Sequence, residues 1–553
     1  MPPLSLSKIR GCRFSLILTA VYLFAAVILF DQYRFEIDPD GIAYISIAFK
    51  YSVGNIADAV NACWGPLYSW LMLPLFKAGF PALTAVKILG VIIGAITLAV
   101  LARLFDLAGV CRQARMFLLL SAIPVILSYA YLLITADLLL LCIILCYVCL
   151  VFSPRYGRGG ALCGFTGVLA YLAKSYALPF FIVHFSLMNC LHYRRASDET
   201  GRKLVLKSCF SGLAVFAAGC ALWSGIISYK YGYFTIGTAG RYNFARIGPQ
   251  SKEVPMLERG HAMLYDGFLD LPNPTAVNAF EDPSYFRRKI WNPLSHFAYY
   301  LSILRINTVA GIRIFLGFSV FSFLILAWAI FKLFPAARRP IQPEEPEEEK
   351  IFMLKSCMLT LGLWIAGYLL IITEERYLWP ANLLLILMSG ILFSLSPGYS
   401  GFASAVPRRR VLFFTAVLFI SSSFTVNPLR NLRLKAGYGR DISWFAEELK
   451  DCYGLSGNLA SNTHWYLNYY LAYHMGSRYY GAAGSAYNCS GLQKELSERQ
   501  IDYYLEWDNS PQTHCAFLCD LPSDKKLFLD NVRLEGSRHT LTVYSVGAQR
   551  EER

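Results

Sequence analysis

Two acidic residues open the first polar segment of the chain. Asp38 and Asp40 stand one residue apart in Phe35-Glu-Ile-Asp-Pro-Asp-Gly, soon after a long apolar stretch. A carboxylate in such a place can take a proton from a substrate, and a pair can bind a cation such as Mg²⁺ or Mn²⁺. Asp-Pro and Asp-Gly are also common turn dipeptides, so the pair alone fits a plain turn equally well.

Two basic residues stand in otherwise apolar surroundings. Lys174 follows Tyr171-Leu-Ala, and Arg376 precedes Tyr377-Leu-Trp-Pro. An ionisable side chain at membrane depth is a candidate functional residue, and Lys174 or Arg376 could hold a phosphate group, Arg376 through two parallel hydrogen bonds. Each also fits an interfacial anchor whose charged end reaches the lipid headgroups.

Further candidates are polar or aromatic side chains in the long segments between apolar spans. Aromatic rings there can stack on a sugar or line a lipid groove, but they also serve as interfacial anchors. The candidate substrate-binding residues are Tyr44, Trp64, Tyr68, Arg241, Asn243, Glu375 and Tyr377, with His261 as a weaker candidate for shaping the pocket.

Composition shows which elements must position these residues. The chain has 553 residues, of which 56% are hydrophobic and 16% charged, and its mean hydropathy is +0.42. Soluble proteins carry about 25% charged residues, and roughly 20 apolar residues cross a ~30 Å hydrocarbon core. We therefore predict a polytopic α-helical membrane protein with about eleven transmembrane helices. The predicted spans are 14–31, 82–104, 116–133, 137–153, 161–173, 176–191, 208–228, 310–334, 351–372, 377–396 and 411–426.

The distribution of Lys and Arg predicts the sidedness of the chain. The net charge is +14, and most basic residues fall in alternate short connections, such as Arg194-Arg195 and Arg408 to Arg410. Such connections face the cytoplasm, which places the N-terminus inside and residues 427–553 outside. No basic stripe with interleaved aromatic residues follows a soluble face, so nucleic acid is not an expected partner.

Three segments are predicted to lie on the outer side. The first loop, 32–81, contains apolar residues at helical spacing from Gly41 to Tyr51, which indicates a short interfacial helix. The loop 229–309 is rich in Pro, Asn, Trp and Tyr. Residues 427–553 alternate helical and strand-like patterns and predict an α/β domain, so the chain divides into a transmembrane module, 1–426, and an extracytoplasmic domain, 427–553.

Four cysteines in the outer domain leave two interpretations open. Cys515 and Cys519 have a spacing that is compatible with a metal, but no second pair accompanies them. Together with Cys452 and Cys489 they could instead form disulfides, provided that the domain faces an oxidising compartment.

The order of these motifs along the chain resembles the GT-C superfamily of glycosyltransferases, in particular bacterial enzymes akin to protein O-mannosyltransferases and aminoarabinose transferases. The resemblance covers residues 10–425. It rests on Asp38-Pro-Asp-Gly-x-x-Tyr, Trp64-Gly-Pro-Leu-Tyr-Ser-Trp, Thr135-Ala-Asp, Tyr171 to Pro179 and Glu375 to Pro380.

This resemblance implies a function. It suggests an inverting transferase of the cytoplasmic membrane that moves a sugar from a polyprenyl phosphate to a hydroxyl of a glycan, lipid or protein acceptor outside the cell. Asp40 would be the catalytic base and Asp38 auxiliary, while Lys174 and Arg376 would bind the donor phosphate. The Asp-Pro-Asp spacing differs from the Asp-Glu pair of protein O-mannosyltransferases and is closer to the Asp-x-Asp of oligosaccharyltransferases, which use a divalent cation. Metal dependence therefore stays open.

Two other functions compete with this one. A transporter or lipid flippase would carry Gly- or Pro-interrupted helices in matching positions of two halves, with charges near the bilayer midplane. A polysaccharide polymerase or ligase would share the outer basic residues but would not need Asp38 and Asp40.

Overall fold

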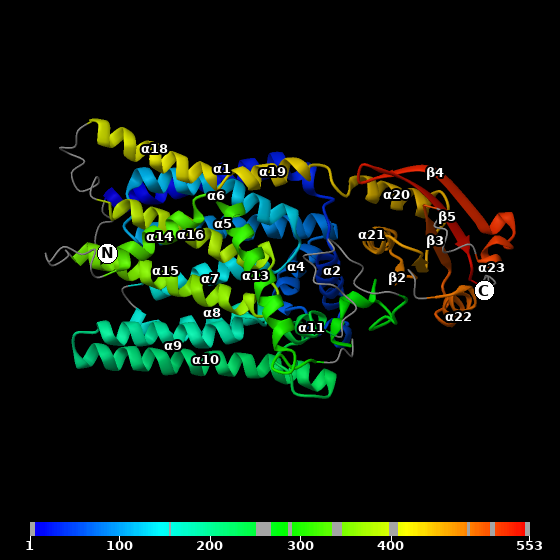
Figure 1. Cartoon of the computed structure of the whole chain (residues 1–553), viewed down its shortest axis with the longest axis horizontal. Coiled ribbons are helices and arrows are strands. Elements are labelled where there is room, and N and C mark those ends of the chain that lie inside the picture. Colours follow the sequence, from blue (N-terminus) through cyan, green and yellow to red (C-terminus); the bar gives the residue numbers. More distant parts are fainter. Residues whose placement is uncertain are drawn as a thin grey trace.

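The protein is a long helical bundle with a small mixed sheet at one end (Figure 1). A computed structural model of the chain describes residues 6–153, 156–249, 267–285, 290–334, 345–396, 407–483, 487–508 and 515–547. We call the end of the bundle next to the sheet the site end, because the short helices α2, α4 and α11 gather there. Their bounds are Pro39–Ser52, Pro66–Lys77 and Ala239–Arg246.

Eight of the described helices or helix pairs are long and apolar enough to cross a membrane. These candidate spans are Phe14–Tyr33 in α1, α5 (Ala82–Leu107), α6 (Arg112–Leu132), α10 (Glu199–Tyr231), α13 (Phe297–Phe318), Glu347–Leu369 in α15, Glu375–Ser394 with α16, and Val411–Leu434 across α18 and α19. Shorter apolar helices are α7 (Asp137–Val151), α8 (Gly160–Ala173) and α14 (Ser322–Leu333), and α9 spans Ala177–Arg195. The chain is thus a multi-pass helical membrane protein, as its composition predicts.

One predicted span is wrong in detail. The sequence predicts a single helix over 310–334, but the structure has α13 from Phe297 and a break before α14. At the break Ser319 Oγ accepts the Phe321 N–H at 3.1 Å, and the Ser322 hydroxyl donates to Phe315 O at 2.6 Å. Serine hydroxyls that bond the backbone compete with the helical ladder, which accounts for the interruption. Residues 297–309 belong to α13 and not to the loop.

Helix α15 begins with an acidic run and extends from Glu345 to Leu369, so Glu347, Glu348 and Glu349 are helical. Negative charge in the first turns of a helix interacts favourably with the helix dipole, which explains why this polar run is helical.

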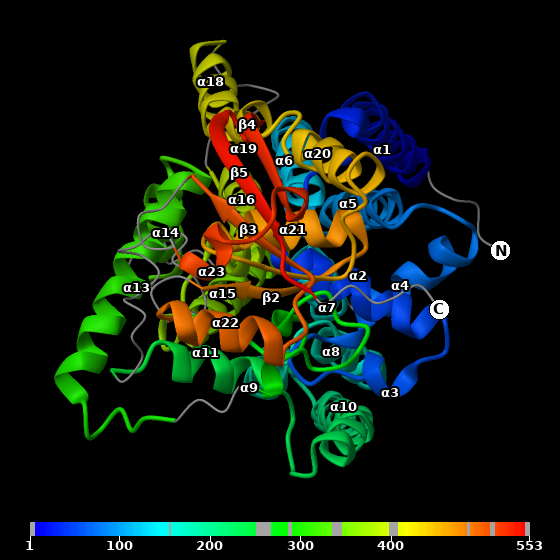
Figure 2. The ribbon, with the colours of Figure 1, turned by 90° about the vertical axis from the view of Figure 1, so that its right-hand side faces the viewer.

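The C-terminal α/β domain has a five-stranded sheet of order β2-β1-β3-β5-β4. β1 is parallel to β2 and β3, while β5 runs antiparallel to β3 and β4. The strands are β1 Asn458–Ser461, β2 Arg478–Ala482, β3 Tyr503–Trp507, β4 Lys526–Leu534 and β5 Ser537–Ser545; the helices are α20 Arg440–Asp451, α21 Trp465–Met475, α22 Cys489–Glu498 and the short α23 Ala516–Cys519. Seen from the site end, this domain lies across the helices of the bundle (Figure 2).

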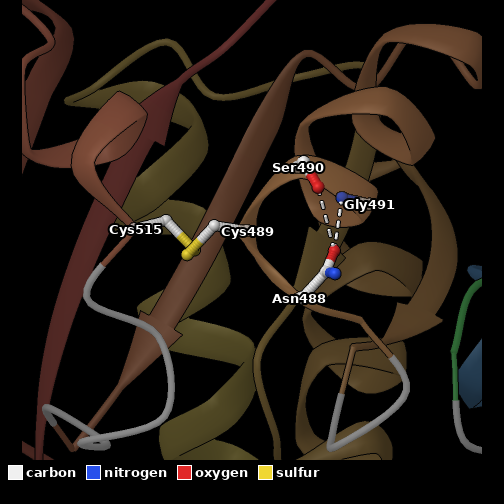
Figure 3. The surroundings of a disulfide bond; sticks show 5 residues. All are labelled: Asn488, Cys489, Ser490, Gly491 and Cys515. Atoms are coloured by element: carbon white, nitrogen blue, oxygen red, sulfur yellow. Dashed lines mark hydrogen bonds between the residues drawn. A yellow bond between two sulfur atoms is a disulfide. The ribbon is translucent and has the colours of Figure 1, made fainter.

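A disulfide joins two of the four cysteines of this domain. Cys489 at the start of α22 is bonded to Cys515 ahead of α23 (Figure 3). Cys452 and Cys519 are free, exposed thiols. Cys515 is therefore not half of a metal-binding pair with Cys519.

A buried ion pair and a hydrogen bond join the first loop, 32–81, to the large loop, 229–309. The Lys50 ammonium forms an ion pair with Glu281, and both side chains are at most 2% exposed. Asn61 adds a hydrogen bond from Nδ2 to Glu281 O at 2.9 Å. Removing one partner of a buried pair leaves an uncompensated charge, so this connection keeps α2 and the loop in one arrangement.

Candidate active site

Asp40 and Arg376 form an ion pair at the site end. Asp40 lies in the first turn of α2, and Arg376 lies in the short 3₁₀ helix Glu375–Leu378 that leads into α16. Arg376 Nη1 donates to Asp40 Oδ2, and Nε donates to Glu374 Oε2 at 2.8 Å. The Asp40 and Arg376 side chains are 16% and 17% exposed, so substrate can reach a pair that is otherwise sheltered from water.

A second ion pair lies beside the first. Lys174, directly after α8, donates from Nζ to Asp137 Oδ1 at 2.6 Å. Asp137 is the first residue of α7 and is buried. Asp137 belongs to the Thr135-Ala-Asp motif, but the sequence alone does not assign it to the site; its predicted position at the same end as Lys174 is the available signal.

The Tyr377 ring brings the two cations together. Lys174 Nζ lies 4.3 Å from the ring centroid, and the Arg376 guanidinium carbon lies 5.1 Å from it. Tyr377 stacks on Tyr368 at 4.8 Å, which holds the ring in place. Cations are attracted to an aromatic face, so Tyr377 supports two like charges at close quarters.

Asp38 has a different environment from Asp40. Its Oδ1 accepts the Gly41 N–H at 2.9 Å as the N-cap of α2, and its Oδ2 accepts the Ile134 N–H at 2.6 Å. Burial raises the pKa of Asp38 to about 6, the charge of Asp40 adds to that rise, and the two backbone N–H groups oppose it. Asp38 therefore ties the start of α2 to the segment before α7.

These hydrogen bonds decide whether Asp38 and Asp40 have oxygens free for the divalent cation that the Asp-Pro-Asp spacing suggests. Both Asp38 oxygens accept backbone donors, and Asp40 is paired with Arg376. A cation on this pair would have to displace all three partners, so the observed donor set does not fit it. Among the described residues, three metal-ligating side chains come together elsewhere, at His464, Asp508 and His539.

The predicted aromatic candidates pack on α2 and α4. Tyr44 and Tyr68 are buried and meet edge-to-face at 5.3 Å, so both belong to the core between the two helices. Trp64 meets Tyr44 at 5.4 Å and Phe280 at 5.4 Å. The Trp64 Nε1 is buried and has no hydrogen-bond partner among the described residues. Trp64 thus carries a buried donor that a ligand could satisfy.

The other predicted contacts are less well placed. Glu375 is exposed, and its neighbour Glu374 makes the bond to Arg376. Arg241 is exposed on α11 and belongs to none of the ion pairs among the described residues, while Asn243 is half-buried on the same helix. His261 lies outside the described residues.

Helix α21 of the C-terminal domain packs beside α2 and the first loop. The ring centroids of Phe280 and Trp465 are 6.2 Å apart, and Phe280 also meets Trp64, which connects α21 to the first loop. Burial raises the pKa of Tyr466 and Tyr469 on this helix, and the charge of Asp40 adds to the rise of both.

Solved structures share this architecture. ArnT from Cupriavidus metallidurans in the apo state superposes with a TM-score of 0.56 at 12% identity, over 96% of this chain and 98% of that one. ArnT bound to undecaprenyl phosphate superposes with a TM-score of 0.53 at 14% identity, over 98% and 99%. The chain has the fold of the GT-C glycosyltransferases.

Further comparisons agree with a GT-C fold at low sequence similarity. The arabinofuranosyltransferase AftD from Mycobacteria superposes with a TM-score of 0.50 at 14% identity, over 97% of this chain and 40% of that one. No protein-family profile matches the sequence, and no curated relative matches it significantly. The superposition on ArnT covers 96% of this chain and therefore includes most of the C-terminal domain.

Proposed function

We propose that this GT-C protein is an inverting glycosyltransferase that moves a sugar from a polyprenyl phosphate to an acceptor hydroxyl, with Asp40 as the general base. The supporting observation is the Asp40–Arg376 ion pair beside Lys174, three charged groups at one end of the bundle. The undecaprenyl phosphate bound to ArnT, a protein of the same fold, supports a polyprenyl donor.

The chemistry requires a base and a site for a leaving anion. The acceptor hydroxyl attacks the anomeric carbon through an oxocarbenium-like state and loses its proton to a carboxylate. The bond from the sugar to the phosphate breaks, and negative charge grows on the lipid phosphate. One carboxylate and direct attack give inversion at the anomeric carbon.

Arg376 and Lys174 are suited to hold that phosphate. The Arg376 Nη2 is 3.4 Å from the Tyr377 hydroxyl, a long contact that leaves this edge of the guanidinium open to a stronger acceptor. Lys174 gives one of its three donors to Asp137 and keeps two. A phosphate would also compete with Asp40 for Arg376, so donor binding would release the Asp40 carboxylate for the acceptor hydroxyl.

Asp38 and Trp64 have supporting roles in this proposal. Asp38 positions Asp40 by capping α2, because its oxygens are committed to backbone donors. The unpaired Trp64 indole N–H can donate to a sugar hydroxyl, and a buried donor gains most when it finds such a partner.

The same proposal places the site outside the cytoplasm. The positive-inside rule puts the basic connections in the cytoplasm and the site end on the outer face of the cytoplasmic membrane. In this proposal the outer domain, 427–553, whose helix α21 packs beside α2, receives a glycan, lipid or protein acceptor.

The position of the charges argues against transport. Asp137 begins α7, Lys174 follows α8, and Arg376 precedes α16, so all three lie at helix ends at one end of the bundle. A transporter would hold its substrate near the bilayer midplane.

The proposal is tested with purified protein, a polyprenyl-phosphate sugar and an extract of envelope acceptors, with mass spectrometry of the products. Asp40→Asn should lower turnover by about 10²–10⁴-fold. Asp31→Asn, at an exposed carboxylate near the same end, is the matched control and should leave turnover unchanged. Unchanged transfer in Asp40→Asn would remove Asp40 from the chemistry.

A further inference from the structure

We propose that His464, Asp508 and His539 form a transition-metal site of the zinc type at the edge of the C-terminal sheet. The three residues come from three separate places: the turn between β1 and α21, the end of β3, and β5. Their ligand atoms all lie within 4.8 Å of one another. This site is separate from Asp40 and goes beyond the proposed sugar transfer.

The spacing of the ligand atoms fits a tetrahedral ion. Asp508 Oδ2 lies 3.1 Å from His464 Nε2 and 2.9 Å from His539 Nδ1. Ligand atoms around tetrahedral zinc lie about 3.3 Å apart, because each is about 2.0 Å from the ion. Small side-chain rotations would therefore exchange the two hydrogen bonds for three metal bonds.

The surroundings hold these side chains in a converging arrangement. The second Asp508 oxygen, Oδ1, accepts the Thr540 N–H at 3.1 Å, which leaves Oδ2 directed at the two rings. Outer hydrogen bonds of this kind orient ligating carboxylates in metal sites. The Trp507 ring lies about equally far from both imidazoles, at 6.0 Å and 5.9 Å, and forms an apolar wall beside them.

Two of the three residues adopt a backbone conformation that non-glycine residues seldom take. His464 has φ 54° and Asp508 has φ 57°. A non-glycine residue in the left-handed region is strained, and such strain is common at functional sites. Here it turns two side chains from different loops toward one point.

The exposure of the cluster leaves room for a further ligand. The side chains of His464, Asp508 and His539 are 35%, 42% and 14% exposed. Three protein ligands and one open position describe zinc sites that bind water or an exchangeable anion. The ion would also fix the start of α21, because His464 immediately precedes Trp465 and Tyr466, the residues next to the candidate active site.

The experiment uses the full-length purified protein, stripped with a chelator and titrated with Co²⁺ and Zn²⁺. Tetrahedral Co²⁺ gives visible d–d absorption, and elemental analysis measures the zinc stoichiometry. We expect about one equivalent of metal per chain and a rise in the unfolding midpoint on zinc addition. His464→Asn and His539→Asn should each weaken binding at least about tenfold. Asparagine tolerates the left-handed conformation of His464, so that variant should fold.

Two control variants separate this site from adventitious binding. His296→Asn removes an exposed histidine outside the cluster, and Cys519→Ser removes an exposed thiol of the same domain. Both should bind metal as the unmodified protein does. The proposal is overturned if the protein binds no stoichiometric metal, or if His464→Asn and His539→Asn bind as tightly as the two controls.

Discussion

The Arg376 guanidinium donates a hydrogen bond to the Asp40 carboxylate across 336 positions of sequence. The contact joins the first turn of α2 to the segment before α16, the two elements that the GT-C resemblance singled out separately. In the proposed function, a donor phosphate that binds Arg376 would compete with Asp40 for the guanidinium. The proposal therefore couples donor binding to the release of the Asp40 carboxylate.

The planar guanidinium geometry of Arg376 should matter for turnover as much as its charge does. Arg376→Lys keeps the charge but cannot hold Asp40, Glu374 and a phosphate in fixed geometry. We expect kcat to fall about 10²–10³-fold, as for the loss of one charge-stabilising donor. Glu374→Gln, which changes only one partner of the guanidinium, should cost less than tenfold. Equal kcat in Arg376→Lys and the unmodified protein would show that charge alone suffices.

Lys174 and Asp137 allow stability and catalysis to be measured apart. Lys174→Met leaves the buried Asp137 carboxylate without its partner and should cost about 3–5 kcal/mol of unfolding free energy. The double variant Lys174→Met, Asp137→Asn removes both charges and should regain most of that loss. It should still transfer sugar poorly, because the donor phosphate lacks Lys174. The test compares thermal unfolding and turnover of the two variants and the unmodified protein; an active double variant would give Lys174 a structural role only.

Gly65 offers a test of positioning without removing any charge. A Cβ at Gly65 would lie 2.3 Å from Ala173 O and 2.4 Å from Leu172 O, in the last turn of α8 directly before Lys174. Gly65→Ala should therefore displace Lys174 and lower kcat/KM by about 10–10²-fold. Gly225→Ala is the control, since its Cβ meets nothing within 4 Å. Equal activity of the two variants would argue against such tight packing.

His474 should make the outer domain sensitive to acid. Burial lowers the pKa of His474 from 6.5 to about 4, and its Nε2 has no hydrogen-bond partner among the described residues. The unfolded chain therefore binds a proton at higher pH than the folded one. The contribution of the neutral His474 to the free energy of unfolding is fully present above about pH 6.5. It is lost as the pH falls toward 4, by up to about 3 kcal/mol.

His474→Phe should remove this part of the pH dependence. The measurement is urea unfolding followed by tryptophan fluorescence between pH 7.5 and 4.5, compared with His296→Gln as a control at an exposed histidine. If the difference in unfolding free energy between His474→Phe and the unmodified protein does not change with pH, His474 is not the titrating group.

Much of the fold could be predicted from the sequence. Apolar spans and the helix from Gly41 correspond to observed helices, because burial in lipid and amphipathic spacing are local signals. The α/β pattern predicted for 427–553 corresponds to the observed five-stranded sheet and its helices.

Other elements could not be predicted in this way. β2 carries Gly481 at φ 128° and pairs with residues of the large loop, where the Tyr479 N–H bonds Val277 O at 2.7 Å. β4 lies at the edge of the sheet and few of its residues are buried, so burial imposes little pattern on its sequence. Such strands depend on distant partners, which a single-sequence pattern does not show.

The candidate site, too, could be predicted from the sequence only in part. Residue type and position relative to the apolar spans indicated Asp40, Lys174 and Arg376, since a charge at the edge of a span needs a reason to be there. Only the tertiary structure paired Asp40 with Arg376, gave Lys174 its partner Asp137, and turned Asp38 into a helix cap.

The sequence by itself determined a membrane-embedded helical chain with charged residues at the ends of its spans, because hydrophobic burial and loop charge act locally along a chain. The tertiary structure decided which charges meet, which cysteines pair, and that His464, Asp508 and His539 converge. Those relationships depend on distances of a few ångströms between residues that lie far apart in sequence, and packing alone sets such distances.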